Sequence, residues 1–200
     1  MTEKQQHPAV NLVARAALPT SHGTFIMHVY ADAAGKEHVA LTVGNVGDGV
    51  PVLARLHSEC LTGDAFGSHR CDCGEQLALS MDMIQAARRG VLVYLRQEGR
   101  GIGLANKIRA YALQEQGLDT VDANRALGLP DDMRDYAGAA AMLHSLGVRT
   151  VTLITNNPAK IAGLERHGVE VVERTPLHTA PNLHNLPYIA AKRERMGHLV

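Results

Sequence analysis

Hydrophobic and polar residues alternate in short runs through the first half of the chain, and this pattern predicts a β-rich region. Four such runs span residues 11–17, 25–30, 38–42 and 51–56. Gly, Asp, Asn and Pro residues, which favour turns, separate them. The spacing predicts a strand meander or a barrel-like sheet.

The pattern then changes to helical spacing. Leu77, Met81 and Ile84 recur on one helix face before Gly90, and the apolar run 91–95 follows. These features predict a helix that leads into a buried strand.

Two further amphipathic helices are expected. The first begins near Gly103, ends at the stop signal Gly117, and has Leu104, Ile108, Tyr111 and Ala112 as its apolar face. The second precedes Gly147 and has Ala139, Met142, Leu143 and Leu146 as its apolar face. Glycine commonly follows the last turn of a helix, so both stop signals are reasonable.

The clearest α/β signal is a buried strand over residues 148–155, followed by Asn157 as N-cap and Pro158 at the first helical position. That short helix should end at Gly168, with a strand over 169–172, a proline-rich loop over 176–187 and a last helix over about 188–196. The whole pattern predicts a mixed α/β (α+β) fold, in which a β-rich N-terminal half packs with a helical α/β C-terminal half. We expect one catalytic domain over residues 1–200, with residues 1–10 as a disordered segment.

Composition excludes several classes of protein. The chain has 200 residues, of which 46% are hydrophobic, and its 20 basic side chains balance its 20 acidic ones. A nucleic-acid partner is not expected, because there is no net basic field to hold a phosphate backbone. No stretch approaches the roughly 20 apolar residues of a membrane span, and the polar start lacks a signal-peptide pattern. We therefore expect a cytoplasmic protein without a membrane partner.

Three cysteines lie within fourteen residues, in the pattern C-x10-C-x-C formed by Cys60, Cys71 and Cys73. Reducing cytosol disfavours a disulfide framework and favours metal binding or catalysis. Three thiolates can form an open zinc site that leaves one position for water. Two alternatives remain: a closed structural site completed by His57 or His69, and a metal-free redox cluster.

Two other segments have features of anion sites. Residues 96–103 place two arginines and three glycines between a strand and a helix, which suits phosphate binding, but a solvated turn explains the composition equally well. Lys160 follows a predicted strand and lies in the first turn of a helix, where a positive charge is unfavourable unless an anion is nearby. An ordinary surface lysine is the alternative.

Five stretches, taken together and in this order, resemble GTP cyclohydrolase II. They are RLHSECLTGD (55–64), RCDCG (70–74), RQEGRGIGL (96–104), NKIRAY (106–111) and LITNNP (153–158). The resemblance covers about residues 18–199. Each motif alone is weak, whereas five with matching gaps are specific.

The resemblance implies a role for each matched position. The implied zinc ligands are Cys60, Cys71 and Cys73. The implied GTP-binding residues are Arg55, Leu56, His57, Ser58, Glu59, Gln76, Glu98, Gly99, Arg100, Thr120, Thr155 and Lys160. Asp132 matches the proton acceptor, Arg134 a proposed nucleophile toward the α-phosphate, and Tyr111 a tyrosine used in ring opening. Electrostatic stabilisation of the leaving phosphate is an equal alternative for Arg134, because a guanidinium is a poor nucleophile.

The implied activity is zinc-dependent hydrolytic opening of the guanine imidazole ring of GTP. The products are 2,5-diamino-6-hydroxy-4-(5-phosphoribosylamino)pyrimidine, formate and pyrophosphate, in the first step of riboflavin biosynthesis. Magnesium accompanies the triphosphate, and the family is usually homodimeric. His69 stands where an apolar residue is expected and lies close to Cys71. Two other functions stay open: a homologue of specialised metabolism that stops at the formamide, and a zinc-containing nucleotide sensor without turnover.

Overall fold

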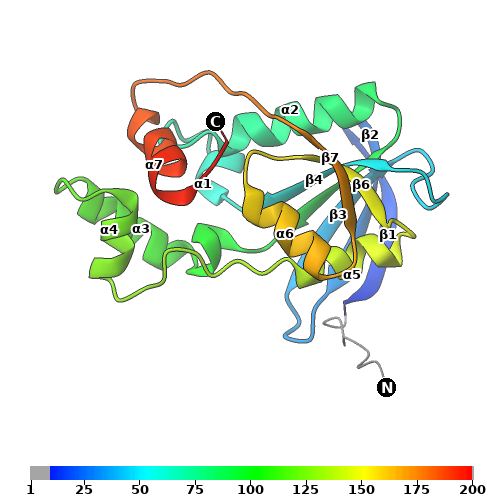
Figure 1. The fold of residues 1–200 in the computed structure, drawn as a ribbon, viewed down its shortest axis with the longest axis horizontal. Coiled ribbons are helices and arrows are strands. Elements are labelled where there is room, and N and C mark those ends of the chain that lie inside the picture. Colours follow the sequence, from blue (N-terminus) through cyan, green and yellow to red (C-terminus); the bar gives the residue numbers. More distant parts are fainter. Residues whose placement is uncertain (1–9, 200) are drawn as a thin grey trace.

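The computed structural model describes residues 10–199, so the prediction for the first ten residues lies, apart from Val10, outside the described part. Within these residues, seven strands form one mixed sheet, and the chain also forms seven α-helices and one 3-10 helix (Figure 1). The strands are β1 (Asn11–Thr20), β2 (Gly23–Ala31), β3 (Glu37–Val43), β4 (Val52–Ser58), β5 (Gly90–Leu95), β6 (Thr150–Ile154) and β7 (Glu170–Thr175). The helices are α1 (Leu61–Asp64), α2 (Cys73–Ala86), η1 (Glu98–Gly101), α3 (Leu104–Gln114), α4 (Thr120–Ala126), α5 (Ala137–Ser145), α6 (Pro158–Arg166) and α7 (Leu186–Met196).

The sheet has the strand order β1-β2-β3-β5-β4-β6-β7. Strands β1, β2 and β3 pair antiparallel in sequence order, so the predicted meander is confirmed for these three strands. Strand β4 departs from the meander, because β5 lies between β3 and β4. Strand β4 runs parallel to both β5 and β6, and β1 and β7 are the edges of an open sheet rather than parts of a barrel.

Two hydrophobic cores cover the two faces of this sheet. On one face, α5 and α6 contribute Met142, Leu143 and Leu164 to a core with Leu56 and Val93 of the sheet. The opposite face is covered by α2, whose Met81 and Ile84 pack with Phe25, Leu41 and Leu92. Helices on both faces of parallel strands are the usual way to bury such strands. The predicted mixed α/β fold is therefore confirmed.

Local signals also placed most helix ends. Asn157 caps α6, and its side chain accepts a hydrogen bond from the backbone N–H of Ala159. Pro158 occupies the first turn, as predicted, because its missing N–H costs nothing there. Helix α7 begins two residues earlier than expected, at Leu186.

The predicted apolar face of α3 is wrong. Leu104 is 39% exposed and Ile108 is 47% exposed, whereas Lys107 and Ala110 are buried. Lys107 points inward because it has sulfur and carboxylate partners, which are described below. Helix α4, a short segment that begins at the Asp119 N-cap, was not predicted at all.

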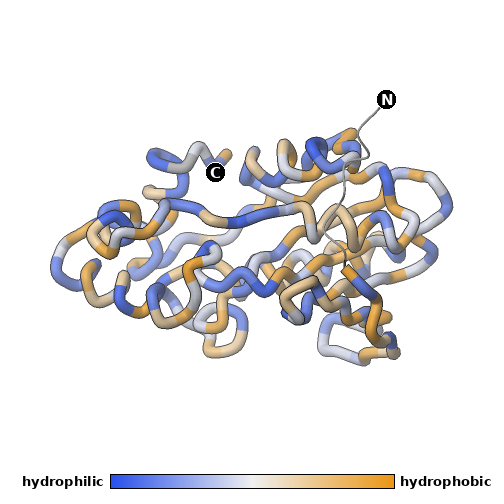
Figure 2. Tube along the Cα trace, turned by 90° about the horizontal axis from the view of Figure 1, so that it is seen from below, coloured by the Kyte–Doolittle hydropathy of each residue, from blue (hydrophilic) through white to orange (hydrophobic). Residues whose placement is uncertain are grey.

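Helices α3, α4 and α7 lie together at one end of the molecule, beyond the carboxyl ends of β4 and β5 (Figure 1). Figure 2 shows hydrophobic residues concentrated around the sheet, whereas polar residues are mixed into this helical end. Among the helices of residues 10–199, none is both long and apolar enough to cross a bilayer. The carboxyl ends of parallel strands therefore face a polar helical region, which is where sites of α/β folds usually form.

Candidate active site

Three cysteine thiols converge at the carboxyl end of β4. Cys60 is the N-cap of α1, Cys71 lies in the following loop, and Cys73 is the first residue of α2. Their Sγ atoms all lie within 4.8 Å of one another, and those of Cys60 and Cys71 are 3.6 Å apart. The loop therefore folds back as the spacing predicted, and the cluster offers three soft ligands to one ion.

Two glycines allow this close approach. A Cβ on Gly63 would lie 2.8 Å from Cys71 Sγ and 3.2 Å from Cys60 Sγ. A Cβ on Gly74 would lie 2.4 Å from the carbonyl oxygen of Gly63. Side chains at these positions would fill the space beside the sulfurs or separate α1 from α2.

The structure argues against a closed site with a histidine as fourth ligand. His57 points Nε2 at Asp64, at 3.0 Å from both carboxylate oxygens. His69 is exposed and lies beside His184, with ring centres 6.2 Å apart and the rings tilted by 32°. Within residues 10–199, the candidate metal cluster at this position consists of the three cysteines alone.

Lys107 of α3 is the cation that contacts the cluster. Its Nζ donates to Cys60 Sγ at 3.1 Å and to Glu98 Oε1 at 2.8 Å. Hydrogen bonds from the Cys71 and Cys73 thiols lower the pKa of Cys60, and the Lys107 ammonium lowers it further, whereas burial opposes the shift. The Cys60 thiolate is thus stabilised by its surroundings, and a bound cation would deprotonate the other two thiols.

The three cysteines form part of the wall of a partly open cavity. Because all three cysteines line this cavity, a ligand could reach an ion held by them, and the residues fit an open zinc site.

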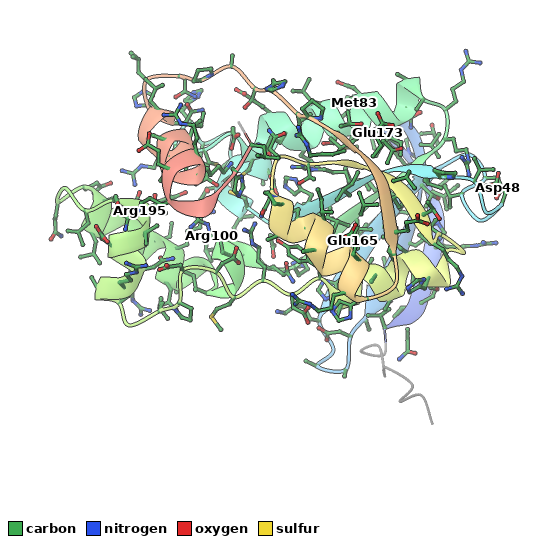
Figure 3. All side chains as sticks on the ribbon, viewed as in Figure 1. Asp48, Met83, Arg100, Glu165, Glu173 and Arg195 are labelled. Carbon is green, nitrogen blue, oxygen red and sulfur yellow. The ribbon has the colours of Figure 1, made fainter. Side chains whose placement is uncertain are left out.

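The same cavity collects positive charge although the chain as a whole is neutral. Its basic side chains are Arg70, Arg100, Lys107, Arg134 and Lys192, against the acidic Glu59 and Glu98. Arg100 lies beneath α7 and between α3 and α6 in the view of Figure 3. Gly99 and Arg100 have φ angles of 60° and 61°, so the glycine-rich segment makes a tight turn at the cavity. Such a wall suits a polyanionic ligand.

The structure brings together many, but not all, of the residues predicted for the site. Those that line the cavity are Cys60, Cys71, Cys73, Ser58, Glu59, Glu98, Gly99, Arg100, Tyr111, Thr120 and Arg134. Those outside its lining are Arg55, Leu56, His57, Gln76, Thr155, Lys160 and Asp132.

Apart from the exposed Asp132, the residues outside the lining form a buried or half-buried layer next to the cavity. Arg55 donates to the carbonyl of Ile154 at 3.1 Å and to Gln76 Oε1 at 2.7 Å. Lys160 is buried and donates to the carbonyl of Leu56 at 2.7 Å. Burial, together with the charges of Arg55 and other cations, holds the pKa of Lys160 well below its usual value. The lysine is therefore not an ordinary surface residue.

Asp132 and Arg134 form a close ion pair at the edge of the cavity. Arg134 Nε donates to the two carboxylate oxygens of Asp132 at 2.9 and 3.0 Å. Burial favours the neutral guanidine, but the hydrogen bonds with Asp132 outweigh it and raise the pKa of Arg134. Burial favours the neutral acid of Asp132, and the same pairing outweighs it and lowers the pKa. This arrangement keeps the guanidinium protonated.

Nine residues of the cavity lining had no predicted role, among them Lys107, Tyr188, Lys192 and His198. Tyr188 Oη lies 4.0 Å from Cys73 Sγ, and Lys192 Nζ donates to Asp72 at 2.6 Å. Lys107 lies within the motif of residues 106–111, but the sequence did not show that its side chain points toward the cysteines. No sequence signal connected the last helix with the cysteines, because its contacts depend on the tertiary fold.

Substituting His69 by alanine is expected to leave the metal spectrum unchanged. The imidazole is exposed and lies beside the ring of His184 rather than joining the sulfur cluster. The visible absorption of cobalt-substituted protein measures this, because ligand changes alter cobalt absorption. Cys71→Ser, which removes a sulfur, should change the same spectrum. If His69→Ala changed the spectrum, that result would show that His69 is a ligand of the metal.

The chain is similar to several known proteins. A family model described as GTP cyclohydrolase II matches residues 11–176. The GTP cyclohydrolase-2 of Neisseria gonorrhoeae is 60% identical over 188 residues, which cover 94% of this chain and 95% of the relative. The GTP cyclohydrolase-2 of Azotobacter vinelandii is 58% identical over 193 residues, covering 96% and 93% of the two chains. RibBX, a two-domain 3,4-dihydroxy-2-butanone 4-phosphate synthase from A. baumannii, has a TM-score of 0.47 and 18% identity, over 88% of this chain and 42% of RibBX. The family model matches most of this chain, and the two GTP cyclohydrolase-2 relatives are 60% and 58% identical to it. The chain therefore belongs to the GTP cyclohydrolase II family.

Proposed function

We propose that this chain opens the guanine imidazole ring of GTP by hydrolysis in a zinc-dependent reaction. The proposed products are 2,5-diamino-6-hydroxy-4-(5-phosphoribosylamino)pyrimidine, formate and pyrophosphate, in the first step of riboflavin biosynthesis. The observation that carries the proposal is a three-thiolate cluster in the wall of a cavity rich in basic side chains. Family membership supports the same reaction.

Cys60, Cys71 and Cys73 are the proposed zinc ligands. When bound, zinc supplies Lewis acidity for activating water toward the purine ring. The chain contributes the fixed sulfur geometry, the partly enclosed cavity and the ammonium of Lys107 beside Cys60. Fixed charges in such a cavity act more strongly than the same charges in bulk water.

The triphosphate, with magnesium bound to its oxygens, is proposed to contact the basic residues of the cavity. Arg100 presents a guanidinium from the tight turn before α3, and Lys192 presents an ammonium from α7. Guanidinium groups match phosphate oxygens in pairs, and both cations neutralise charge as pyrophosphate leaves. Thr120 at the start of α4 is a further proposed contact.

Tyr111 is proposed to hold a proton at its phenol oxygen during ring opening. Burial raises the pKa of Tyr111, so the phenol stays protonated near neutral pH. The guanidinium of Arg70 lies 4.8 Å from the centre of its ring and fixes the ring against the cavity wall. A protonated phenol can donate to a ring nitrogen that gains charge when its bond to carbon breaks.

For Arg134, the ion pair favours electrostatic stabilisation of the leaving phosphate over covalent attack. A nucleophilic guanidine must lose a proton, and pairing with Asp132 opposes that loss. Proton acceptance by Asp132 would require this pair to open when substrate binds. The remaining proposed GTP contacts in the buried layer, among them Arg55, Gln76 and Lys160, would support the wall from behind.

Arg134→Lys should therefore still release pyrophosphate, with kcat/KM lowered by about tenfold to hundredfold, because a single ammonium replaces a forked donor. Stopped reactions analysed for pyrophosphate and for covalent phosphoramidate test this. We expect no adduct in either protein. An adduct present on the parent chain and lost in Arg134→Lys would establish the covalent role.

The proposed function is tested by incubating the zinc-loaded chain with GTP and Mg²⁺ and quantifying formate, pyrophosphate and the diaminopyrimidine. Equal yields of all three, abolished in Cys71→Ser, are expected. Pyrophosphate without formate would instead indicate a homologue that stops at the formamide. Intact GTP after long incubation would favour a nucleotide sensor.

Three further features belong to the proposal. We infer one catalytic domain, a homodimer and a cytoplasmic location. Family membership supports these inferences. Sedimentation of the purified chain tests the dimer.

A further inference from the structure

Lys107 is a buried cation with two fixed partners. Its side chain comes from the inner face of α3 and is only 8% exposed. Its Nζ lies 3.1 Å from Cys60 Sγ and 2.8 Å from Glu98 Oε1. Lysines are rarely buried unless they are paired, so the two partners of this ammonium account for its burial.

Glu98 holds the ammonium in place. One of its oxygens accepts from the backbone N–H of Leu61 at 2.7 Å, and the other accepts from that of Gly99 at 2.7 Å. Gly99 has a φ of 60°, and a Cβ there would lie 3.2 Å from Lys107 Cβ. The tight turn after β5 thus brings the glutamate against the lysine and leaves room for the lysine stem.

The charge of the sulfur cluster explains why a cation is useful there. Three thiolates and one divalent ion carry a single net negative charge, which is costly to bury. Three thiolates also donate much electron density to the metal, which works against acidification of a water on it. An N–H···S hydrogen bond from an ammonium withdraws some of this density and places a positive charge beside the sulfur.

We infer that Lys107 is a positioning residue that tunes the metal centre through its hydrogen bond to the Cys60 thiolate, with Glu98 as its holder. This inference rests on the proposed zinc site. It assigns Glu98 a role in holding the lysine rather than in contacting GTP. A lysine that only bound phosphate would affect substrate affinity and leave the metal spectrum unchanged.

The test compares Lys107→Met, which keeps the stem and removes the donor, with Lys107→Arg, which keeps a cationic donor. Lys36→Met is the matched control, because Lys36 is exposed in the turn before β3. Each full-length protein is loaded with Co²⁺ to record the sulfur-to-cobalt charge-transfer band. Zinc affinity is measured by competition with a chromophoric chelator, and kcat and KM for GTP are measured on zinc-loaded protein.

We expect the charge-transfer band of Lys107→Met to shift to longer wavelength, because the thiolate becomes a stronger donor. Zinc affinity should fall by about tenfold to hundredfold, as for loss of other groups that contact metal ligands. The kcat should fall more than KM rises, and Lys107→Arg should recover part of each effect. Lys36→Met should match the parent.

An unchanged band and unchanged zinc affinity in a folded Lys107→Met protein would overturn the inference, and a raised KM alone would then make Lys107 a phosphate ligand. The spectrum and the zinc affinity do not depend on turnover. If the parent chain bound metal but left GTP intact, the proposed function would fail while this inference remained testable.

Discussion

Replacing Gly63 by alanine is expected to remove most of the bound metal and, with it, the activity. The added Cβ would lie 2.8 Å from Cys71 Sγ, 3.1 Å from Cys73 Cβ and 3.2 Å from Cys60 Sγ. Ordinary carbon contacts are about 3.5–4.0 Å, so the methyl group would push at least one sulfur away from the position that it needs. We expect zinc affinity to fall by at least about a hundredfold, because the change displaces metal ligands rather than their neighbours.

Metal content after dialysis and competition with a chelator measure this effect directly. Gly138→Ala is the matched control, because Gly138 lies in α5 and a Cβ there meets no atom within 4 Å. Alanine also favours a helix over glycine, so the control should be neutral or slightly stabilising. Circular dichroism confirms that both variants fold. Metal content equal to that of the parent in a folded Gly63→Ala protein would contradict the steric account.

Strand positions were predictable from the sequence because each strand carries its own local pattern. The position of β5 between β3 and β4 was not predictable from that pattern, because strand pairing joins segments that lie far apart along the chain and does not depend on local composition. Helix α3 shows the opposite failure. Its apolar periodicity was clear, yet Leu104 and Ile108 lie outside and Lys107 lies inside. A buried ion pair can override the hydrophobic pattern of a helix. The spacing of apolar residues at about 3.6 positions per turn does not reveal the partners of such a pair.

The cysteine cluster could be predicted because three ligands within a short segment need only one loop to fold back. The spacing alone left open whether a histidine is the fourth ligand. In the structure His57 is hydrogen-bonded to Asp64, and the candidate cluster among the described residues contains the three cysteines alone. The contribution of α7 could not be predicted. Tyr188 and Lys192 lie beyond residue 176, where the match to the family model ends, and they reach the cavity only through tertiary packing.

Asp64→Asn is expected to destabilise the chain by about 1–3 kcal/mol, because it leaves a buried donor without an acceptor. The Asp64 carboxylate accepts from three groups: Cys60 N at 2.9 Å, Tyr94 Oη at 2.8 Å and His57 Nε2 at 3.0 Å. Burial lowers the pKa of His57, so its ring is neutral at pH 7 and must carry its proton on Nε2 to donate here. Asparagine keeps the shape but offers one oxygen, and its amide would face at least one of these donors.

Asp82→Asn provides a matched comparison, because Asp82 also pairs with a histidine, His22, at 2.7 Å. The Asp82 side chain is 58% exposed, whereas that of Asp64 is 6% exposed. An exposed ion pair contributes about 0–1 kcal/mol, so denaturant unfolding of Asp82→Asn should nearly match the parent. Asp64→Asn should also bind zinc more weakly, since Asp64 anchors the backbone of Cys60 behind the sulfur cluster. Equal losses of stability in Asp64→Asn and Asp82→Asn would show that burial does not set the cost of the substitution. The hydrogen bonds around Asp64 would then not be what holds Cys60 in place.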